Sequence, residues 1–259
     1  MKKLFHLVVA LASLAIFVTI SHFAFAAQKK EARVTQVIKD VHLLPTGASP
    51  RPASVNDYVS TGTAVRTGSD SRTELTFTDQ TLARLGANSI FSFREGGKNF
   101  DLTSGAMLIC VPKESGTTTV RVGAATAAVT GFTAMFEHHA KGWNKFIVLH
   151  GQGTISFVGL RTEPCELHAG QMVVWPPHPK KCPDILNVDL SKLLQGKLIN
   201  GFSGKLPELD LILSDAEDQK TSPPPGGLTD PTNVDALDQS GAARPTPPPP
   251  VRTFSPPGR

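Results

Sequence analysis

The sequence predicts an all-β domain, either an antiparallel β-sandwich or a short β-solenoid, followed by one or two short helices and a disordered proline-rich tail. Three observations support this fold class. Apolar and polar residues alternate in short runs such as residues 73–77, 145–149 and 154–158, which is the period of a half-buried strand. Glycine-centred turns separate these runs at the spacing of about 8–12 residues that is typical of sandwiches and barrels. Large apolar residues become scarce beyond Ser214, where proline is frequent.

Residues 1–26 are predicted to be a secretory signal peptide. Lys2 and Lys3 precede an apolar run over residues 4–23, and the Ala-Phe-Ala tripeptide at 24–26 fits a cleavage site. The run also approaches the ~20 residues that cross a bilayer, so an uncleaved anchor is the alternative. We expect a chain exported to the periplasm or the extracellular space, with no integral membrane segment after cleavage.

Removal of the signal peptide takes away Lys2 and Lys3 and no acidic residue, so the formal charge falls from +4 to +2. The remaining lysines and arginines are scattered among acidic residues. Such a chain offers no electrostatic reason to bind nucleic acid.

Residues 27–188 are expected to form the β domain. Within residues 72–77, Leu75 and Phe77 should face a core, while Arg72 and Glu74 project from the strand. Gly68 and Gly86 should supply a positive φ at chain reversals. We expect Arg72, Glu74, Arg84 and Asn88 to hold strand pairs and turns together, because cross-strand charged pairs and Asn turns are ordinary devices of sheets.

Residues 189–214 are predicted to contain the helices. Leucines 190, 193, 194 and 198 fall on one helical face, and Asp189 can cap the first turn. A second helix is predicted over residues 206–213, with Pro207 in its first turn. We expect the leucine stripe to pack on the β domain; binding to a partner is the alternative.

Residues 215–259 are predicted to be disordered, because they contain 11 prolines and few large apolar residues. The tail is interpreted as a linker or spacer. The alternative is a polyproline ligand for an aromatic-lined groove.

Short motifs follow one another through the β region at residues 65–77 (VRTGSDSRTELTF), 82–89 (LARLGANS), 102–106, 127–133, 148–151 and 169–171. The first two segments are similar to the central signature of FecR-type domains, and the other four resemble later motifs of that family in the same order. The resemblance covers about residues 55–174. Its family-motif residues, for which we expect structural roles, are Thr67, Gly68, Arg72, Glu74, Leu75, Phe77, Arg84, Leu85, Gly86, Asn88, Gly131, Gly151 and Gly170. The sequence departs from the pattern at Gln80, Phe132 and His150.

The resemblance implies an extracytoplasmic all-β domain of transmembrane signalling regulators, which acts through protein contacts. Those regulators usually carry a cytoplasmic anti-sigma segment and a membrane helix ahead of the domain. Here the signal peptide comes first, so we expect a free-standing exported module without the anti-sigma segment.

Candidate chemistry elsewhere is sparse. His138 and His139 are adjacent and would point to opposite faces of a strand, and His168 and His178 lack a zinc-type spacing, so no metal is expected. Residues 151–153 form a lone Gly-x-Gly before a strand, which disfavours nucleotide binding. No nucleophile elbow is present. We expect no cofactor and no catalysis.

The predicted function is therefore a non-catalytic module that binds an envelope or extracellular protein or has a structural role, with a part in extracytoplasmic signalling. A carbohydrate-binding module is the alternative, although Trp143, Trp175 and Tyr58 are the only tryptophans and tyrosine available as sugar platforms. A cell-wall or glycan hydrolase, for which a carboxylate pair such as Asp57 and Glu74 would have to meet, is a third.

The three cysteines predict one disulfide in an exported chain. Cys110 lies in an apolar strand run, where a free thiol behaves as a small buried hydrophobe. Cys165 and Cys182 each sit beside a proline, outside strand interiors, and are predicted to pair with each other. An intermolecular bridge or three free thiols are the alternatives.

Overall fold

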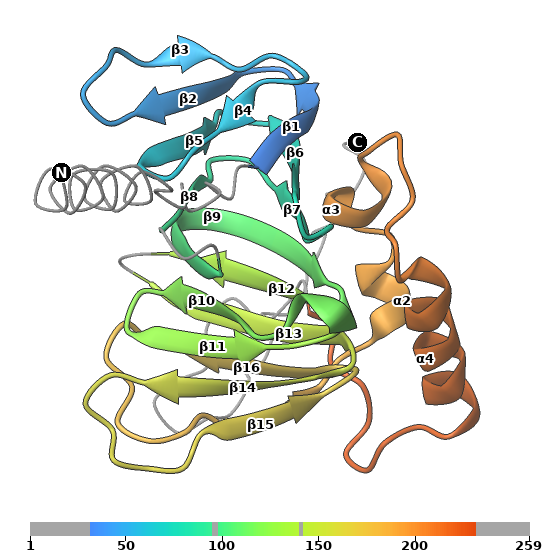
Figure 1. Cartoon of the computed structure of the whole chain (residues 1–259). Coiled ribbons are helices and arrows are strands. Elements are labelled where there is room, and N and C mark those ends of the chain that lie inside the picture. Colours follow the sequence, from blue (N-terminus) through green and yellow to red (C-terminus); the bar gives the residue numbers. More distant parts are fainter. Residues whose placement is uncertain (1–31, 95–97, 140–141, 232–259) are drawn as a thin grey trace, which may run out of the picture.

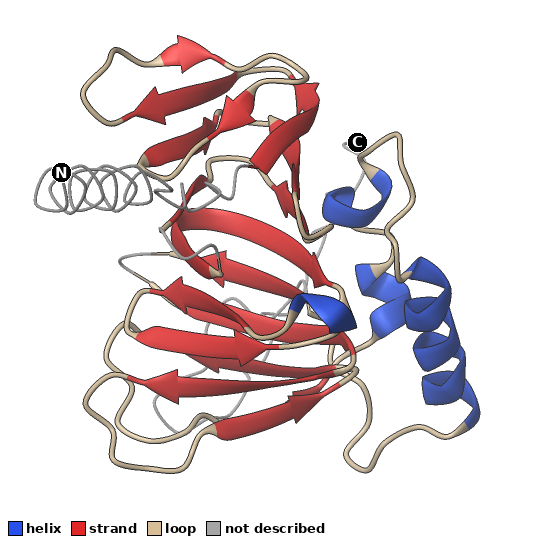
Figure 2. Cartoon of the chain, in the orientation of Figure 1, coloured by secondary structure: helices blue, strands red, loops and turns tan. Residues whose placement is uncertain are grey.

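The computed structural model describes residues 32–94, 98–139 and 142–231. The predicted signal peptide and residues 232–259 of the predicted tail lie outside the described residues. Strands dominate the chain and the helices are short, which confirms the all-β prediction (Figure 2). In the part of the chain that is described, no helix is both long and apolar enough to cross a membrane.

The strands form two layers packed face to face (Figure 1). The chain alternates between the layers, mostly two strands at a time, which gives a sandwich with a solenoid-like path. The first layer contains, in spatial order, β4 (Tyr58–Val59), β1 (Ala32–Ile38), β6 (Arg72–Phe77), β7 (Leu82–Leu85), the second half of β9 (Asn99–Val111), β12 (Phe132–His138), β13 (Asn144–His150), β16 (Gln171–Trp175) and β17 (Leu186–Asn187). The second layer contains β3 (Arg51–Pro52), β2 (Val41–Pro45), β5 (Thr63–Thr67), β8 (Ile90–Phe93), the first half of β9, β10 (Thr118–Val122), β11 (Ala125–Val129), β14 (Gln152–Phe157) and β15 (Cys165–His168).

Strand β9 belongs to both layers and joins them. Its first half pairs with β8 and β10, and its second half pairs with β7 and β12. The change of layer falls at Gly105, which has φ +84°, and a Cβ there would lie 2.3 Å from Ser89 Oγ. A glycine is therefore required where the strand bends from one layer into the other. The β9–β10 pair is parallel, whereas the other strand pairs among the described strands are antiparallel.

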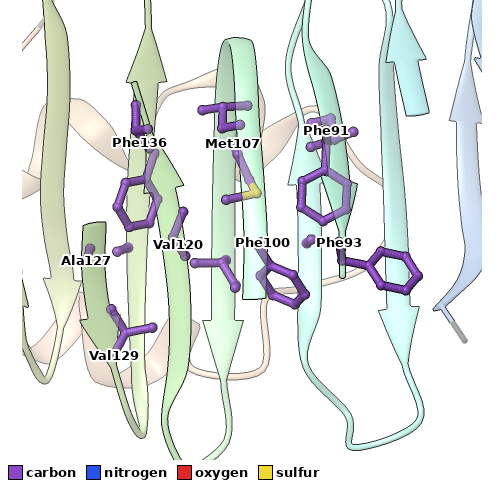
Figure 3. Close-up of a cluster of buried hydrophobic side chains, with 14 of the residues drawn as sticks. Phe91, Phe93, Phe100, Met107, Val120, Ala127, Val129 and Phe136 are labelled. Atoms are coloured by element: carbon purple, nitrogen blue, oxygen red, sulfur yellow. The ribbon is translucent and has the colours of Figure 1, made fainter. Parts of the chain in front are cut away.

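The space between the layers holds the larger core, which we call the interlayer core. Phe91, Phe93 and Phe100 of the second layer pack together with ring centroids 5.4–6.4 Å apart where the rings contact. Met107 and Phe136 come from the first layer (Figure 3). Every side chain labelled in that view is buried, which follows from the alternation of the strand sequences.

The outer face of the first layer carries a second core, formed with the C-terminal segment 189–231, which we call the helical cover. Its helices are α2 (Leu190–Leu193), α3 (Lys197–Asn200) and α4 (Leu209–Thr221), and they lie beside the first layer (Figure 1); a short 3-10 turn, η1 (Lys113–Ser115), lies in the connection after β9. Leu190, Leu193 and Leu198 pack against first-layer residues, which confirms that the leucine stripe packs on the domain. Asp189 caps α2 by accepting from the backbone N–H groups of Ser191 and Lys192.

The second helix is present, but its predicted bounds and the predicted start of disorder are wrong. Helix α4 begins at Leu209, after Pro207, and continues to Thr221. It is ordered past Ser214 because Ile212 and Ala216 are buried against the first layer. The chain then follows the domain as far as Pro231, whose carbonyl accepts from Lys145 Nζ at 2.9 Å. Contacts of this kind outweigh a composition that favours disorder.

Two turn glycines of the family motif, Gly68 and Gly86, lack the positive φ that was predicted for them. That conformation is adopted by their neighbours Asp70 (φ 50°) and Asn88 (φ 54°), and by Gln80 (φ 65°). Gly68 instead lies close to Asp40: a Cβ there would lie 2.6 Å from Asp40 Oδ2 and 3.2 Å from Asp40 Cβ, so that the Asp40 side chain would have to move. Three other family-motif glycines do have positive φ: Gly131, Gly151 and Gly170.

Candidate functional site

Arg84 is the centre of a buried polar cluster on the outer face of the first layer. Its side chain is fully buried, and Nε donates to Glu74 Oε2 at 2.9 Å across the β6–β7 pair. The remaining guanidinium nitrogens donate to the helical cover: Nη1 to the carbonyls of Leu198 (3.3 Å) and Ile199 (2.9 Å), and Nη2 to that of Gly204 (2.6 Å). The same group lies 4.5 Å above the ring of Phe202. Arg84 therefore holds the cover onto the sheet.

Neighbouring side chains extend this cluster. Glu74 Oε1 accepts from Thr35 Oγ1 at 2.8 Å and from Gln36 Nε2 at 3.1 Å, and Gln36 Oε1 accepts from the backbone N–H of Ser203 at 2.9 Å. The predicted cross-strand pair is therefore present. Glu74 projects from the face opposite the interlayer core, as expected, but the cover buries that face, so that Glu74 is only 6% exposed.

Asp70 joins a turn of the sheet to α3. Its carboxylate pairs with Lys39, with Lys197 of α3 (3.1 Å) and more distantly with Arg72 (3.8 Å). Hydrogen bonds from Lys39 and Lys197 lower the pKa of Asp70 to about 2. This surface cluster is a second fastening between the sheet and the cover.

The other family-motif residues lie in turns and in the interlayer core. Thr67 Oγ1 donates to the carbonyl of Gly86 at 2.6 Å and accepts from the backbone N–H of Ser89 at 2.9 Å, which joins two turns of the motif. The apolar members Leu75, Phe77 and Leu85 belong to the interlayer core. Gly131 and Gly151 lie side by side, and a Cβ on Gly151 would be 2.9 Å from the Gly131 carbonyl. Gly170 lies in the turn between β15 and β16.

The outer face of the second layer is open to solvent and polar. A row of in-register positions crosses five strands, and its members carry hydroxyl, carboxylate and guanidinium groups. The row consists of Ser92, Asp101, Arg121, Thr126 and Ser156. All five are partly or fully exposed. We call this face the uncovered face, and it is the candidate binding surface of the described structure.

A groove forms on the uncovered face where two strands diverge. Strands β5 and β8 pair at two positions, Val65 with Phe91 and Arg66 with Ile90, and then separate. A cavity of about 610 Å³ lies at this separation, and a smaller one of about 250 Å³ adjoins it. The first is lined by Leu44, Thr46, Thr61, Gly62, Ala64, Ser92, Phe93, Arg94, Asp101 and Thr103. The second is lined by Arg94, Asn99, Phe100, Asp101, Thr119 and Arg121.

Two arginines and one aspartate lie where the cavities meet. Arg94 Nε donates to Asp101 Oδ2 at 2.9 Å, and Arg121 Nε lies 3.6 Å from Asp101 Oδ1. Arg94 and Asp101 line both cavities, so this cluster connects them into one groove. The sequence prediction missed these three residues, because a strand pair that ends early leaves no pattern in the sequence.

The residues considered for other chemistry have separate places. Asp57 pairs with Arg51 at 2.7 Å, and hydrogen bonds from Arg51 and from the Ser54 backbone lower the pKa of Asp57. Because Glu74 pairs with Arg84, the two carboxylates are not brought together. His138 Nδ1 contacts Asn144 Oδ1, and His139 packs on Trp143. Within residues 32–94, 98–139 and 142–231, no three His, Cys, Asp or Glu side chains are arranged to hold a metal ion.

The cysteines behave as predicted. Cys165 and Cys182 form a disulfide, which fastens the start of edge strand β15 to the segment before β17. Cys110 is free and buried in the core beneath the helical cover. Burial raises the pKa of the Cys110 thiol to about 12.

The fold and these surfaces define a two-layered all-β module with one covered and one uncovered sheet face. Residues 63–154 match the family described as FecR protein, within the range that the motifs predicted. The chain therefore contains a FecR-type domain.

Two crystal structures of a proposed anti-sigma factor from Parabacteroides distasonis ATCC 8503, at 1.65 and 2.50 Å resolution, are similar to part of the chain. Each has 14% sequence identity and a TM-score of 0.42, over 51% of this chain. The match spans 65% and 64% of those chains, which is less than two thirds of their length. No curated protein matches the chain.

Proposed function

We propose that this protein is an exported, non-catalytic module that binds an envelope or extracellular protein through its uncovered face and takes part in extracytoplasmic signalling. The observation that carries the proposal is the difference between the two outer sheet faces. The first layer is covered by residues of the same chain, and the guanidinium group of Arg84 binds backbone carbonyls of that cover. The second layer presents its polar row and its groove to solvent.

The disulfide supports export, because such bonds persist in oxidising compartments. The predicted signal peptide supports it independently. The FecR match supports a signalling role. The uncovered face is rich in hydroxyl and charged side chains, as expected of a surface that forms a non-obligate, partly polar interface.

Site-specific photo-cross-linking in the native envelope tests this proposal. A photo-reactive amino acid is placed at Ser156, on the uncovered face, and in a matched chain at Leu211, which is 48% exposed on α4. We expect one defined protein to be cross-linked from Ser156 and not from Leu211. Cross-links from Leu211 alone, or none from Ser156 in a folded and exported chain, would overturn the proposal.

A further inference from the structure

We propose that the groove at the divergence of β5 and β8 binds an extended acidic segment of the partner protein, with an Asp or Glu carboxylate held between Arg94 and Arg121. This inference rests on the proposed function, because it states the chemistry of the partner. Its basis is the charge, the shape and the lining of the two joined cavities.

The charge that a partner meets at the groove is positive. Arg94 and Arg121 share a single carboxylate, that of Asp101, so the cluster has one positive charge in excess. The side chains of the arginines are 56% and 51% exposed, whereas that of Asp101 is 20% exposed. Asp101 therefore lies beneath the guanidinium groups and orients them. A guanidinium has five N–H donors in a planar fork that matches a carboxylate, so each arginine retains donors for a ligand.

The shape suits an extended chain. The lining residues come from β2, β5, β8, β9 and β10, which are neighbours in the second layer, and from turns that adjoin these strands (Thr46, Thr61, Gly62 and Arg94). Four regular strand spacings of about 4.8 Å would span roughly 19 Å, and the separation of β5 and β8 widens this, so the groove accommodates at least about six residues of extended polypeptide. Hydroxyl groups of Thr46, Thr61, Ser92 and Thr103 line the larger cavity and can bond a peptide backbone, while Leu44 and Ala64 provide apolar contact.

The lining favours a protein segment over a glycan. Sugar-binding grooves use exposed aromatic faces, and the aromatic residues that line the two cavities, Phe93 and Phe100, are each 2% exposed. Trp175 is 1% exposed in the interlayer core, and Trp143 packs on Lys145 beside the helical cover. Charged and hydroxyl groups, without an aromatic platform, remain to recognise the ligand.

The test uses an octapeptide in which Glu and Asp alternate with Ser, its Gln and Asn counterpart, and tetragalacturonate as an acidic glycan. Binding to the full exported chain is measured by fluorescence anisotropy of the labelled probes at low and at high salt. We expect the acidic peptide to bind at least fivefold more tightly than its neutral counterpart and than the glycan, with the difference decreasing at high salt. Equal binding of the two peptides, or tighter binding of the glycan, would overturn the inference.

Variants separate the role of each charge. Arg94→Gln and Arg121→Gln should each weaken binding of the acidic peptide about fivefold, as expected for a partly exposed charged hydrogen bond. Asp101→Asn should strengthen it, because the competing negative charge is removed while the amide oxygen of asparagine can still accept from Arg94 and orient it. Arg66→Gln is the matched control. Arg66 is exposed on β5 and lines neither cavity, so this variant should bind the acidic peptide with the affinity of the wild type. Weakening by Asp101→Asn, or an equal loss in Arg66→Gln, would show that selective positive charge is not what binds.

The cross-linking experiment separates this inference from the proposed function. If Ser156 still cross-links the same partner in an Arg94→Gln, Arg121→Gln double variant, the uncovered face binds a protein but the groove does not hold its acidic segment. If the wild-type chain gives no partner from Ser156, the proposed function fails first.

Discussion

Arg84 on β7 and Glu74 on β6 form a buried ion pair in direct cross-strand register, 2.9 Å apart, and the pair lies beneath residues that follow it by more than 100 positions in the chain. Glu74 satisfies one side of the guanidinium, and backbone carbonyls of α3 and its following turn satisfy the rest. A charge pair inside the family motif thus attaches a segment outside the matched region. The pairing of β6 with β7 and the attachment of the helical cover therefore involve the same two side chains.

Arg84→Ala is expected to lower the free energy of unfolding by about 3–5 kcal/mol, because it leaves the Glu74 carboxylate buried without its cation and three carbonyls without a donor. Urea denaturation measures the change. Arg66→Ala, an exposed arginine on the other layer, is the control and should stay within about 0.5 kcal/mol of wild type. A loss below about 1 kcal/mol for Arg84→Ala would show that the pair does not hold the cover.

The ion pairs of Asp70 should make stability depend on pH in the acid range. Its folded pKa is about 2, below the unfolded value of about 3.9, so the stabilisation is complete above pH ~4 and is lost as pH falls toward 2. Asp70→Asn should therefore be less stable than wild type at pH 7, and the two should converge near pH 2. Asparagine tolerates the positive φ of this position, so the substitution tests the charge. A difference that stays constant between pH 7 and pH 2 would contradict this assignment.

Sequence patterns predicted the strands, the interlayer core and the packing of the leucine stripe on the domain, but not that this packing buries the outer face of β6. Leu75 and Phe77 alternate with polar residues, and this period is enough to assign them to a core. The same alternation assigns Glu74 to a solvent-facing side. That assignment fails because Leu198, Ile199 and Gly204 approach from a distant part of the chain, and no local pattern reports such an approach.

The candidate site was less predictable than the fold. The groove exists because β5 and β8 pair at two positions and then diverge, which is a property of strand geometry in three dimensions. Arg94 and Arg121 are separated by a strand and a loop in sequence and meet at Asp101 through the parallel β9–β10 pair. The prediction of a positive φ at Gly68 failed for a similar reason. Gly68 does not have a positive φ, and its close neighbour is Asp40, which lies 28 positions earlier in the chain.

Two glycine substitutions separate conformational cost from steric cost. Gly151 and Gly159 have nearly equal φ values of +83° and +84°, but a Cβ on Gly151 would lie 2.9 Å from the Gly131 carbonyl and Phe132 Cβ, whereas nothing lies within 4 Å at Gly159. Gly159→Ala should cost about 1–2 kcal/mol, and Gly151→Ala about 1–3 kcal/mol more, because it adds overpacking. Thermal or urea unfolding measures both. Equal costs would mean that the Gly151 turn relaxes freely.

Limited proteolysis should leave a protected fragment that ends near Pro231. Residues 215–231 are held by α4, by the Lys192–Asp230 ion pair and by the bond from Lys145 to the Pro231 carbonyl. The proline-rich composition of residues 232–259 predicts rapid cleavage there. Subtilisin digestion followed by intact-mass measurement gives the end point, and Lys145→Met should move it toward Thr221. A wild-type fragment ending near Ser214 would contradict this boundary.

The cysteines give the most direct test of compartment and fold together. Cys165 and Cys182 are bonded and 17 positions apart, and closing a loop of this size stabilises a domain by roughly 3 kcal/mol in the chain-entropy model. Cys110 is buried with a pKa raised to about 12, so almost none of it is the reactive thiolate near neutral pH. We expect no fast-reacting thiol in the folded protein and one thiol per chain after unfolding without reductant. Replacement of both paired cysteines by alanine should lower the free energy of unfolding by about 3 kcal/mol and still leave one thiol per unfolded chain, that of Cys110.

Cys110→Ala, the matched control, should remove the single thiol and keep the bridge. Three thiols in the unfolded, unreduced chain, or a covalent dimer on a non-reducing gel, would contradict an intramolecular Cys165–Cys182 bridge.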